Sequence, residues 1–179
     1  MTRPKHPLTP LDRAALERVG LRYVERYATT RGKLVSYLKR KIRERGWEGE
    51  APAEPGALAE KFAQLGYIDD RAFAEARASA MGRRGLGARR VGEALRFAGI
   101  EAEDADAVAP LIADDRIASA LAFARRKRIG PHARDAVTDR KLLEKQVGAM
   151  VRAGHSPSLA WKIARMAPGD DAEAMLAES

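Results

Sequence analysis

The sequence predicts an all-α protein made of three tandem three-helix modules. Two observations indicate this fold class. The chain of 179 residues contains 35 Ala and 16 Leu but only 8 Val, 7 Ile and 5 Thr, so strong helix formers far outnumber the β-branched residues that favour strands. Apolar residues also recur at helical spacing, and the same triplet of helices recurs at fixed offsets along the chain.

The first predicted module covers residues 1–68 and includes an N-terminal extension. Its first helix, over about residues 12–28, has an apolar face formed by Leu16, Val19, Gly20, Tyr23 and Tyr27. A second helix begins near Thr30 and ends at Gly46, because glycine favours the backbone conformation that stops a helix. A third follows the loop over residues 47–56, and its stripe consists of Leu58, Phe62 and Leu65.

Two further copies of this triplet are predicted from internal alignment, over residues 69–113 and 114–168. An offset of 53 residues aligns Arg31-Gly32 with Arg84-Gly85 and Gly46-Trp47 with Gly99-Ile100. An offset of 45 residues aligns Asp69-Asp70-Arg71 with Asp114-Asp115-Arg116. In the third copy we expect a helix over residues 139–153 that stops at Gly154. The acidic tail, residues 169–179, is expected to be a frayed terminus.

Composition limits the classes of function. Without cysteine there is no disulfide framework, thiolate zinc site or cysteine nucleophile, and no segment is apolar enough to span a membrane. We therefore expect a cytoplasmic protein. We also expect a monomer that has no cofactor. The net charge of +8, concentrated in the first and last thirds of the chain, favours a polyanionic partner.

Several motifs have a structural and a chemical interpretation. The acidic pairs Asp69-Asp70 and Asp114-Asp115 each open a predicted helix and are expected to be N-caps, with a metal or acid/base role as the alternative. The glycines of residues 82–87 predict a turn between two helices, which could also dock phosphates. The three histidines have no partners at a recognisable spacing, so we expect no catalytic residue and no metal site.

Basic residues recur beside the predicted helices of all three copies. A solvated face is one explanation, and successive contacts with the phosphates of an extended polyanion are the other. The candidate binding residues are Lys39, Arg40, Arg43, Arg83, Arg84, Arg89, Arg90, Arg125, Arg126 and Arg128. Tyr37 and Trp161 could stack on bases or pack in the core.

The segment Leu65–Ala74 (LGYIDDRAFA), with GLGARR at residues 85–90, Leu95 and Gly99-Ile100 after it, closely resembles the RecX regulatory proteins. The likeness continues upstream to Thr30 and, more loosely, downstream to Met166. It implies three tandem three-helix repeats, which agrees with the internal alignment. It also implies binding to the RecA recombinase, mainly as its filament on DNA, with inhibition of ATP hydrolysis, strand exchange and co-protease activity.

The residues that match the family motif best are of types that stabilise a fold, and none of them is expected to contact a partner. We interpret them as a cap, a core aromatic, a turn, a core aliphatic and a helix stop, in the order Asp70, Phe73, Gly85, Leu95 and Gly99. The basic residues off the apolar stripes would make the contacts. The resulting hypothesis is a non-enzymatic modulator, elongated and curved, that binds the RecA filament and DNA without any membrane contact. The expected DNA is single-stranded, with double-stranded DNA as a further candidate. A helical DNA-binding transcription regulator is the alternative.

Overall fold

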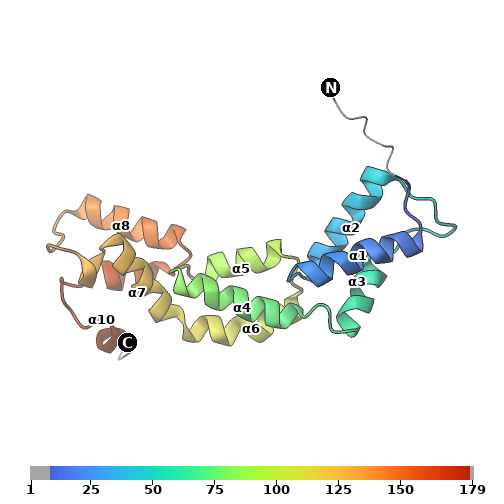
Figure 1. Cartoon of the computed structure of the whole chain (residues 1–179). Coiled ribbons are helices and arrows are strands. Elements are labelled where there is room, and N and C mark those ends of the chain that lie inside the picture. Colours follow the sequence, from blue (N-terminus) through green and yellow to red (C-terminus); the bar gives the residue numbers. More distant parts are fainter. Residues whose placement is uncertain (1–8, 178–179) are drawn as a thin grey trace, which may run out of the picture. The chain divides into compact units, whose positions relative to one another are not determined.

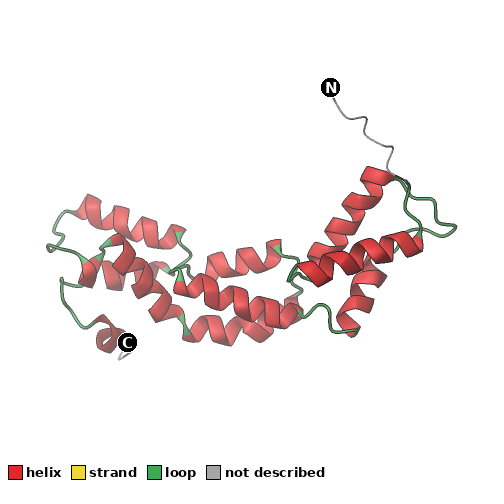
Figure 2. Cartoon of the chain, viewed as in Figure 1, coloured by secondary structure: helices red, strands yellow, loops and turns green. Residues whose placement is uncertain are grey.

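The structure, a computed structural model, describes residues 9–177 and is all-α (Figures 1 and 2). Over these residues it contains ten α-helices, one short 3₁₀ helix and no strand beyond an isolated bridge between Leu11 and Trp47. The predicted fold class is therefore confirmed. The α-helices are α1 (Arg13–Arg26), α2 (Arg31–Arg45), α3 (Pro55–Gln64), α4 (Asp70–Arg83), α5 (Ala88–Phe97), α6 (Ala102–Asp114), α7 (Arg116–Lys127), α8 (Arg140–Arg152), α9 (Pro157–Ala164) and α10 (Ala172–Ala177).

Contacts within the chain define two compact units. Unit 1 comprises residues 1–73 and 98–100, and unit 2 comprises residues 74–97 and 101–179. Helix α4 begins in the first unit and ends in the second. The division into modules at residues 69 and 114 stays a prediction.

Unit 1 is organised around the packing of α1, α2 and α3. Leu34 and Leu38 of α2 are completely buried, and Phe62 of α3 is 2% exposed. Gly20 of α1 makes this packing possible, since a Cβ there would lie 2.8 Å from the Phe62 ring. Each helix hides an apolar stripe that it could not bury alone. Leu65, predicted to complete the stripe of the third helix, is the exception: α3 ends at Gln64, and Leu65 follows it and is 61% exposed.

A glycine contact joins the start of α2 to Gly99 within unit 1. A Cβ on Gly32 would lie 2.7 Å from the Cα of Gly99, so the two backbones touch directly. Thr30, which is fully buried, caps α2 by accepting a hydrogen bond from the Lys33 N–H and donates its hydroxyl to the Ala98 carbonyl. The start of α2 is therefore fixed by backbone contact and by one bridging hydroxyl.

The carboxylate of Asp70 does not cap its own helix. It accepts hydrogen bonds from the backbone N–H and the Nε of Arg31, at 3.0 and 2.8 Å, and so caps α2. Asp69 caps α4, because its Oδ1 accepts from the Ala72 N–H at 2.8 Å. The two aspartates therefore cap different helices. Asp69 caps α4, whereas Asp70 pairs with the Arg31 side chain and accepts from the Arg31 backbone N–H at the start of α2.

Unit 2 contains the rest of α4 and helices α5–α10, with a core of buried residues from α7, α8, α9 and α10. The contact made by Gly32 and Gly99 recurs here between Gly87 and Gly154, where a Cβ on Gly87 would lie 2.5 Å from the Gly154 carbonyl oxygen. An offset of 55 residues relates the two pairs, because it takes Gly32 to Gly87 and Gly99 to Gly154. The internal alignment used an offset of 53 and paired Gly32 with Gly85 instead. The three-dimensional equivalent of Gly32 is therefore Gly87.

Two expectations for unit 2 are wrong. Asp115 precedes α7, but no side chain caps that helix, because α6 runs on to Asp114 and the junction is a tight turn. The predicted frayed terminus is helical over residues 172–177, and Ala172 and Leu176 are buried against the unit 2 core. An apolar side chain at spacing i, i+4 is enough to dock this short helix.

Candidate functional site

The ten basic residues predicted to bind a polyanion are all exposed, and they lie in both units. Lys39, Arg40 and Arg43 belong to α2 in unit 1. The members in unit 2 lie at the end of α4, at the start of α5 and around the end of α7, and they are Arg83, Arg84, Arg89, Arg90, Arg125, Arg126 and Arg128. They lie on or beside four helices.

Arg89 and Arg90 have an intramolecular role. Their guanidinium groups donate hydrogen bonds to the carbonyls of Val151 and Arg152, at 3.0 and 3.1 Å, in the last turn of α8. Both also pair with Glu93, and the hydrogen bond from Arg90 lowers the pKa of that carboxyl. Cations at the negative end of a helix stabilise it, so these two side chains hold α8 in place as well as facing solvent.

Arg126 is engaged in a similar way. Its guanidinium donates to the carbonyl of Arg84 at 2.5 Å and lies 5.6 Å from the ring centroid of Phe123. Arg83, Arg125 and Arg128 have no ion pair with another described residue, although Arg128 adopts a left-handed conformation at the end of α7. Fewer cations of unit 2 are therefore available to bind a partner than the number of basic residues in the sequence indicates.

The turn of residues 84–87 is built around close backbone contacts. Gly85 has a φ of 74°, and a Cβ there would lie 2.6 Å from the Phe123 backbone nitrogen. The carbonyl of Gly85 accepts a hydrogen bond from Nε2 of buried His155 at 3.1 Å. Burial lowers the pKa of His155, so its ring is neutral at pH 7. This turn is therefore a packed junction, as the structural interpretation expected.

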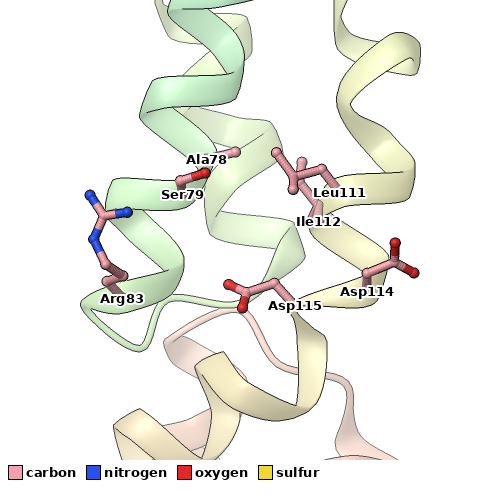
Figure 3. Close-up of a pocket in the computed structure, with 7 residues that line it drawn as sticks. All are labelled: Ala78, Ser79, Arg83, Leu111, Ile112, Asp114 and Asp115. Atoms are coloured by element: carbon pink, nitrogen blue, oxygen red, sulfur yellow. The ribbon is translucent and has the colours of Figure 1, made fainter.

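A surface pocket of about 390 Å³ lies between α4 and α6 in unit 2 (Figure 3). Arg83 and Ser79 lie on one side of it, and Asp114 and Asp115 lie on the other, near Leu111 and Ile112. The two carboxylates do not pair with Arg83 in the described structure. No group of three potential metal ligands occurs anywhere in residues 9–177, so this pocket has no ligand set for an ion.

The family-motif residues have the following environments. Leu95 is 2% exposed, and Gly85 and Gly99 have positive φ angles, as a core aliphatic, a turn and a helix stop require. Phe73 is only half-buried and is not part of either core cluster. The ammonium of Lys33 lies 4.6 Å from its ring centroid, so this aromatic binds a cation instead of filling a core.

The aromatic residues of unit 1 were assigned incompletely from the sequence. Tyr23 and Tyr27 were placed on the core-facing stripe of α1, but Tyr27 is 49% exposed and Val24 is buried in its place. Tyr23 stacks on Tyr37 of α2 with ring centroids 4.2 Å apart. The signal that would have located this cluster is the interleaving of Arg22 and Arg26 with the two tyrosines along α1.

Trp161 of α9 packs against the unit 2 core, and the guanidinium of Arg165 lies 4.8 Å from its ring. Its packing interpretation is therefore the one the structure supports. Among the described residues no helix is both long and apolar enough to cross a membrane.

Two curated proteins match most of the chain. A protein of Myxococcus xanthus (strain DK1622) described as "Regulatory protein RecX" is 31% identical over 170 residues, which is 89% of this chain and 89% of that protein. One of Agrobacterium fabrum (strain C58 / ATCC 33970) with the same description is 30% identical over 154 residues, covering 84% and 81%. No family model matches the chain.

A solved structure has the same fold. The crystal structure of RecX from Lactobacillus salivarius superposes with a TM-score of 0.59, covering 84% of this chain and 92% of that one at 18% identity.

Proposed function

Because the chain belongs to the RecX family of regulatory proteins, we propose that it binds the RecA recombinase, mainly as the filament that RecA forms on DNA. In this proposal it inhibits the ATP hydrolysis, strand exchange and co-protease activity of RecA. It acts as a cytoplasmic monomer without catalysis and without a cofactor. The observation that carries the proposal is the identity of about 30% to curated RecX proteins over more than four-fifths of the chain.

The charge distribution supports contact with an extended polyanion. Lys39, Arg40 and Arg43 of α2 and the basic residues at the α7 end are exposed, and Lys39, Arg43, Arg125 and Arg128 form no ion pair with another described residue. Unpaired surface cations are free to meet DNA phosphates or acidic patches of the recombinase, and each phosphate contact adds affinity that salt weakens. We expect these four residues to contribute more to binding than Arg89 and Arg90.

Inhibition then follows from unequal affinity. A ligand shifts an equilibrium only when it binds one state better than the other. If the chain binds the filament state in which ATP is not turned over more tightly than the active state, occupancy of the filament lowers the hydrolysis rate. Binding across neighbouring RecA subunits would let one copy act on more than one active site.

The test is ATP hydrolysis by the cognate RecA on single-stranded DNA, with this protein titrated in at two salt concentrations. We expect inhibition at well below one copy per RecA subunit and weaker inhibition at the higher salt. The double variant R125Q/R128Q should inhibit less, and R134Q/R140Q, which removes the same charge elsewhere in unit 2, should match the wild type. Absence of inhibition, together with sequence-selective binding to duplex DNA, would favour a transcription regulator instead.

A further inference from the structure

Helices α1 and α2 of unit 1 pack against each other (Figure 1). An aromatic and basic groove lies on the surface between them. Its volume is about 390 Å³, within the range of ligand-binding pockets. We call it the tyrosine groove, and the residues that line it are Val19, Arg22, Tyr23, Arg26, Tyr27, Tyr37, Lys41, Glu44 and Arg45.

The aromatic part of the groove is a continuous cluster of three rings. Tyr23 and Tyr37 are stacked, with an interplanar angle of 19°, and the Tyr27 ring centroid lies 5.2 Å from that of Tyr23. Tyr27, at the end of α1, leaves nearly half of its surface open to solvent. A half-exposed ring beside two others offers a planar apolar surface on which another flat ring can stack.

The charged part of the groove is strongly positive. Four cations line it, Arg22, Arg26, Lys41 and Arg45, against the single carboxylate of Glu44. Lys41 already binds Glu44 at 2.8 Å, and this hydrogen bond lowers the pKa of the carboxyl. Arg22 and Arg26 are exposed, one helical turn apart, and form no ion pair with another described residue.

We propose that the tyrosine groove binds single-stranded nucleic acid. Arg22 and Arg26 would contact successive phosphates while a base stacks on Tyr27. A duplex fits this combination poorly because its bases are stacked on one another and present only their edges. An acidic peptide would use the cations and leave the rings without a partner. The assignment deepens the proposed function, and rests on it, in that DNA within the filament would be the natural occupant.

The direct test measures binding of the full chain to a fluorescent oligothymidylate of about 20 nucleotides by polarisation, without recombinase. Y27L removes the stacking surface and keeps the charge, so we expect affinity to fall about 5- to 150-fold. R22Q/R26Q should lower affinity and reduce the slope of log K against log salt by about 1.4, the value for two lost single-strand phosphate contacts.

The matched control is R134Q/R140Q, which removes two charges at exposed positions of unit 2 that do not line the groove. It should leave the salt slope and the effect of Y27L unchanged. The proposal is overturned if R134Q/R140Q lowers the slope and R22Q/R26Q does not, or if Y27L binds as the wild type does. It is also overturned if polyglutamate displaces the oligonucleotide from the wild type and from Y27L at the same concentration.

This assay separates the groove from the regulatory proposal. Oligonucleotide binding that depends on Tyr27, in a protein that fails to inhibit RecA, would keep the groove and remove the proposed function. Inhibition of RecA that is unaffected by Y27L, with no oligonucleotide bound, would remove the groove alone.

Discussion

Replacing Gly32 by alanine tests the backbone contact at the start of α2. Alanine is a better helix former than glycine by up to about 1 kcal/mol, so at an open helical position the substitution stabilises. At Gly32 the new Cβ would lie 2.7 Å from the Gly99 Cα and 2.8 Å from its carbonyl oxygen. Backbone atoms cannot rotate away, and overpacking of this kind costs about 1 to 3 kcal/mol. With a propensity gain of about 0.5 kcal/mol at the second position of a helix, we therefore expect a net loss of about 0.5 to 2.5 kcal/mol.

Gly56 provides the matched control. It also occupies the second position of a helix in unit 1, but a Cβ there would meet nothing within 4 Å. Gly56→Ala should therefore stabilise unit 1 by about 0.5 kcal/mol. The two substitutions are chemically identical and have opposite expected signs, which removes any dependence on the absolute stability of the protein.

The assay is urea unfolding followed by the fluorescence of Trp47, which packs against the core of unit 1. The chain has two tryptophans, so a Trp161→Phe background makes the signal specific to this unit. The midpoint should fall for Gly32→Ala and rise for Gly56→Ala at constant slope. If Gly32→Ala raises the midpoint as Gly56→Ala does, the two backbones are not in contact and the reasoning fails.

Three further predictions concern unit 2. Because the pKa of His155 lies below its unfolded value of 6.5, the folded state binds fewer protons. Stability should be complete above pH 6.5 and fall as the pH drops below it, and His155→Gln should flatten a plot of urea midpoint against pH. R89Q/R90Q should lower the midpoint by the equivalent of about 0.5 to 2 kcal/mol and speed amide exchange at the end of α8, because two cations leave its carbonyls; unchanged exchange would contradict this role. Leu176→Ala should cost about 2 to 4 kcal/mol in thermal or urea unfolding, whereas a frayed terminus would show no change.

The helices and their ends could be predicted from the sequence because they depend on residues close to one another in the chain. Apolar spacing located α1, α2 and α3, and the positive-φ glycines Gly46 and Gly154 stop α2 and α8 where expected. Local signals also explain why an internal alignment of the stop glycines could find the repeat at all.

Side-chain roles that depend on residues distant in the sequence could not be predicted from local patterns. Asp70 looked like a cap for its own helix, but Arg31, 39 residues away in the sequence, takes its carboxylate. Phe73 and Tyr27 carry aromatic rings at core spacing, but Phe73 is only half-buried and Tyr27 is 49% exposed, and a cation lies near each ring. The basic run near Arg126 gave no sign that this arginine donates a hydrogen bond to the carbonyl of Arg84, 42 residues earlier in the sequence.

The two glycine contacts, Gly32 with Gly99 and Gly87 with Gly154, have a consequence for how such a chain can change. Both sides of each contact are main-chain atoms, so the fit depends on the path of the backbone and not on the chemistry of any side chain. Charges and aromatic rings on the outer faces can therefore be exchanged for a different partner while each joint keeps its geometry. The geometry of these two joints therefore depends on residues that have no side chain, whereas the candidate binding residues lie on the surface, where substitution leaves the joints unchanged.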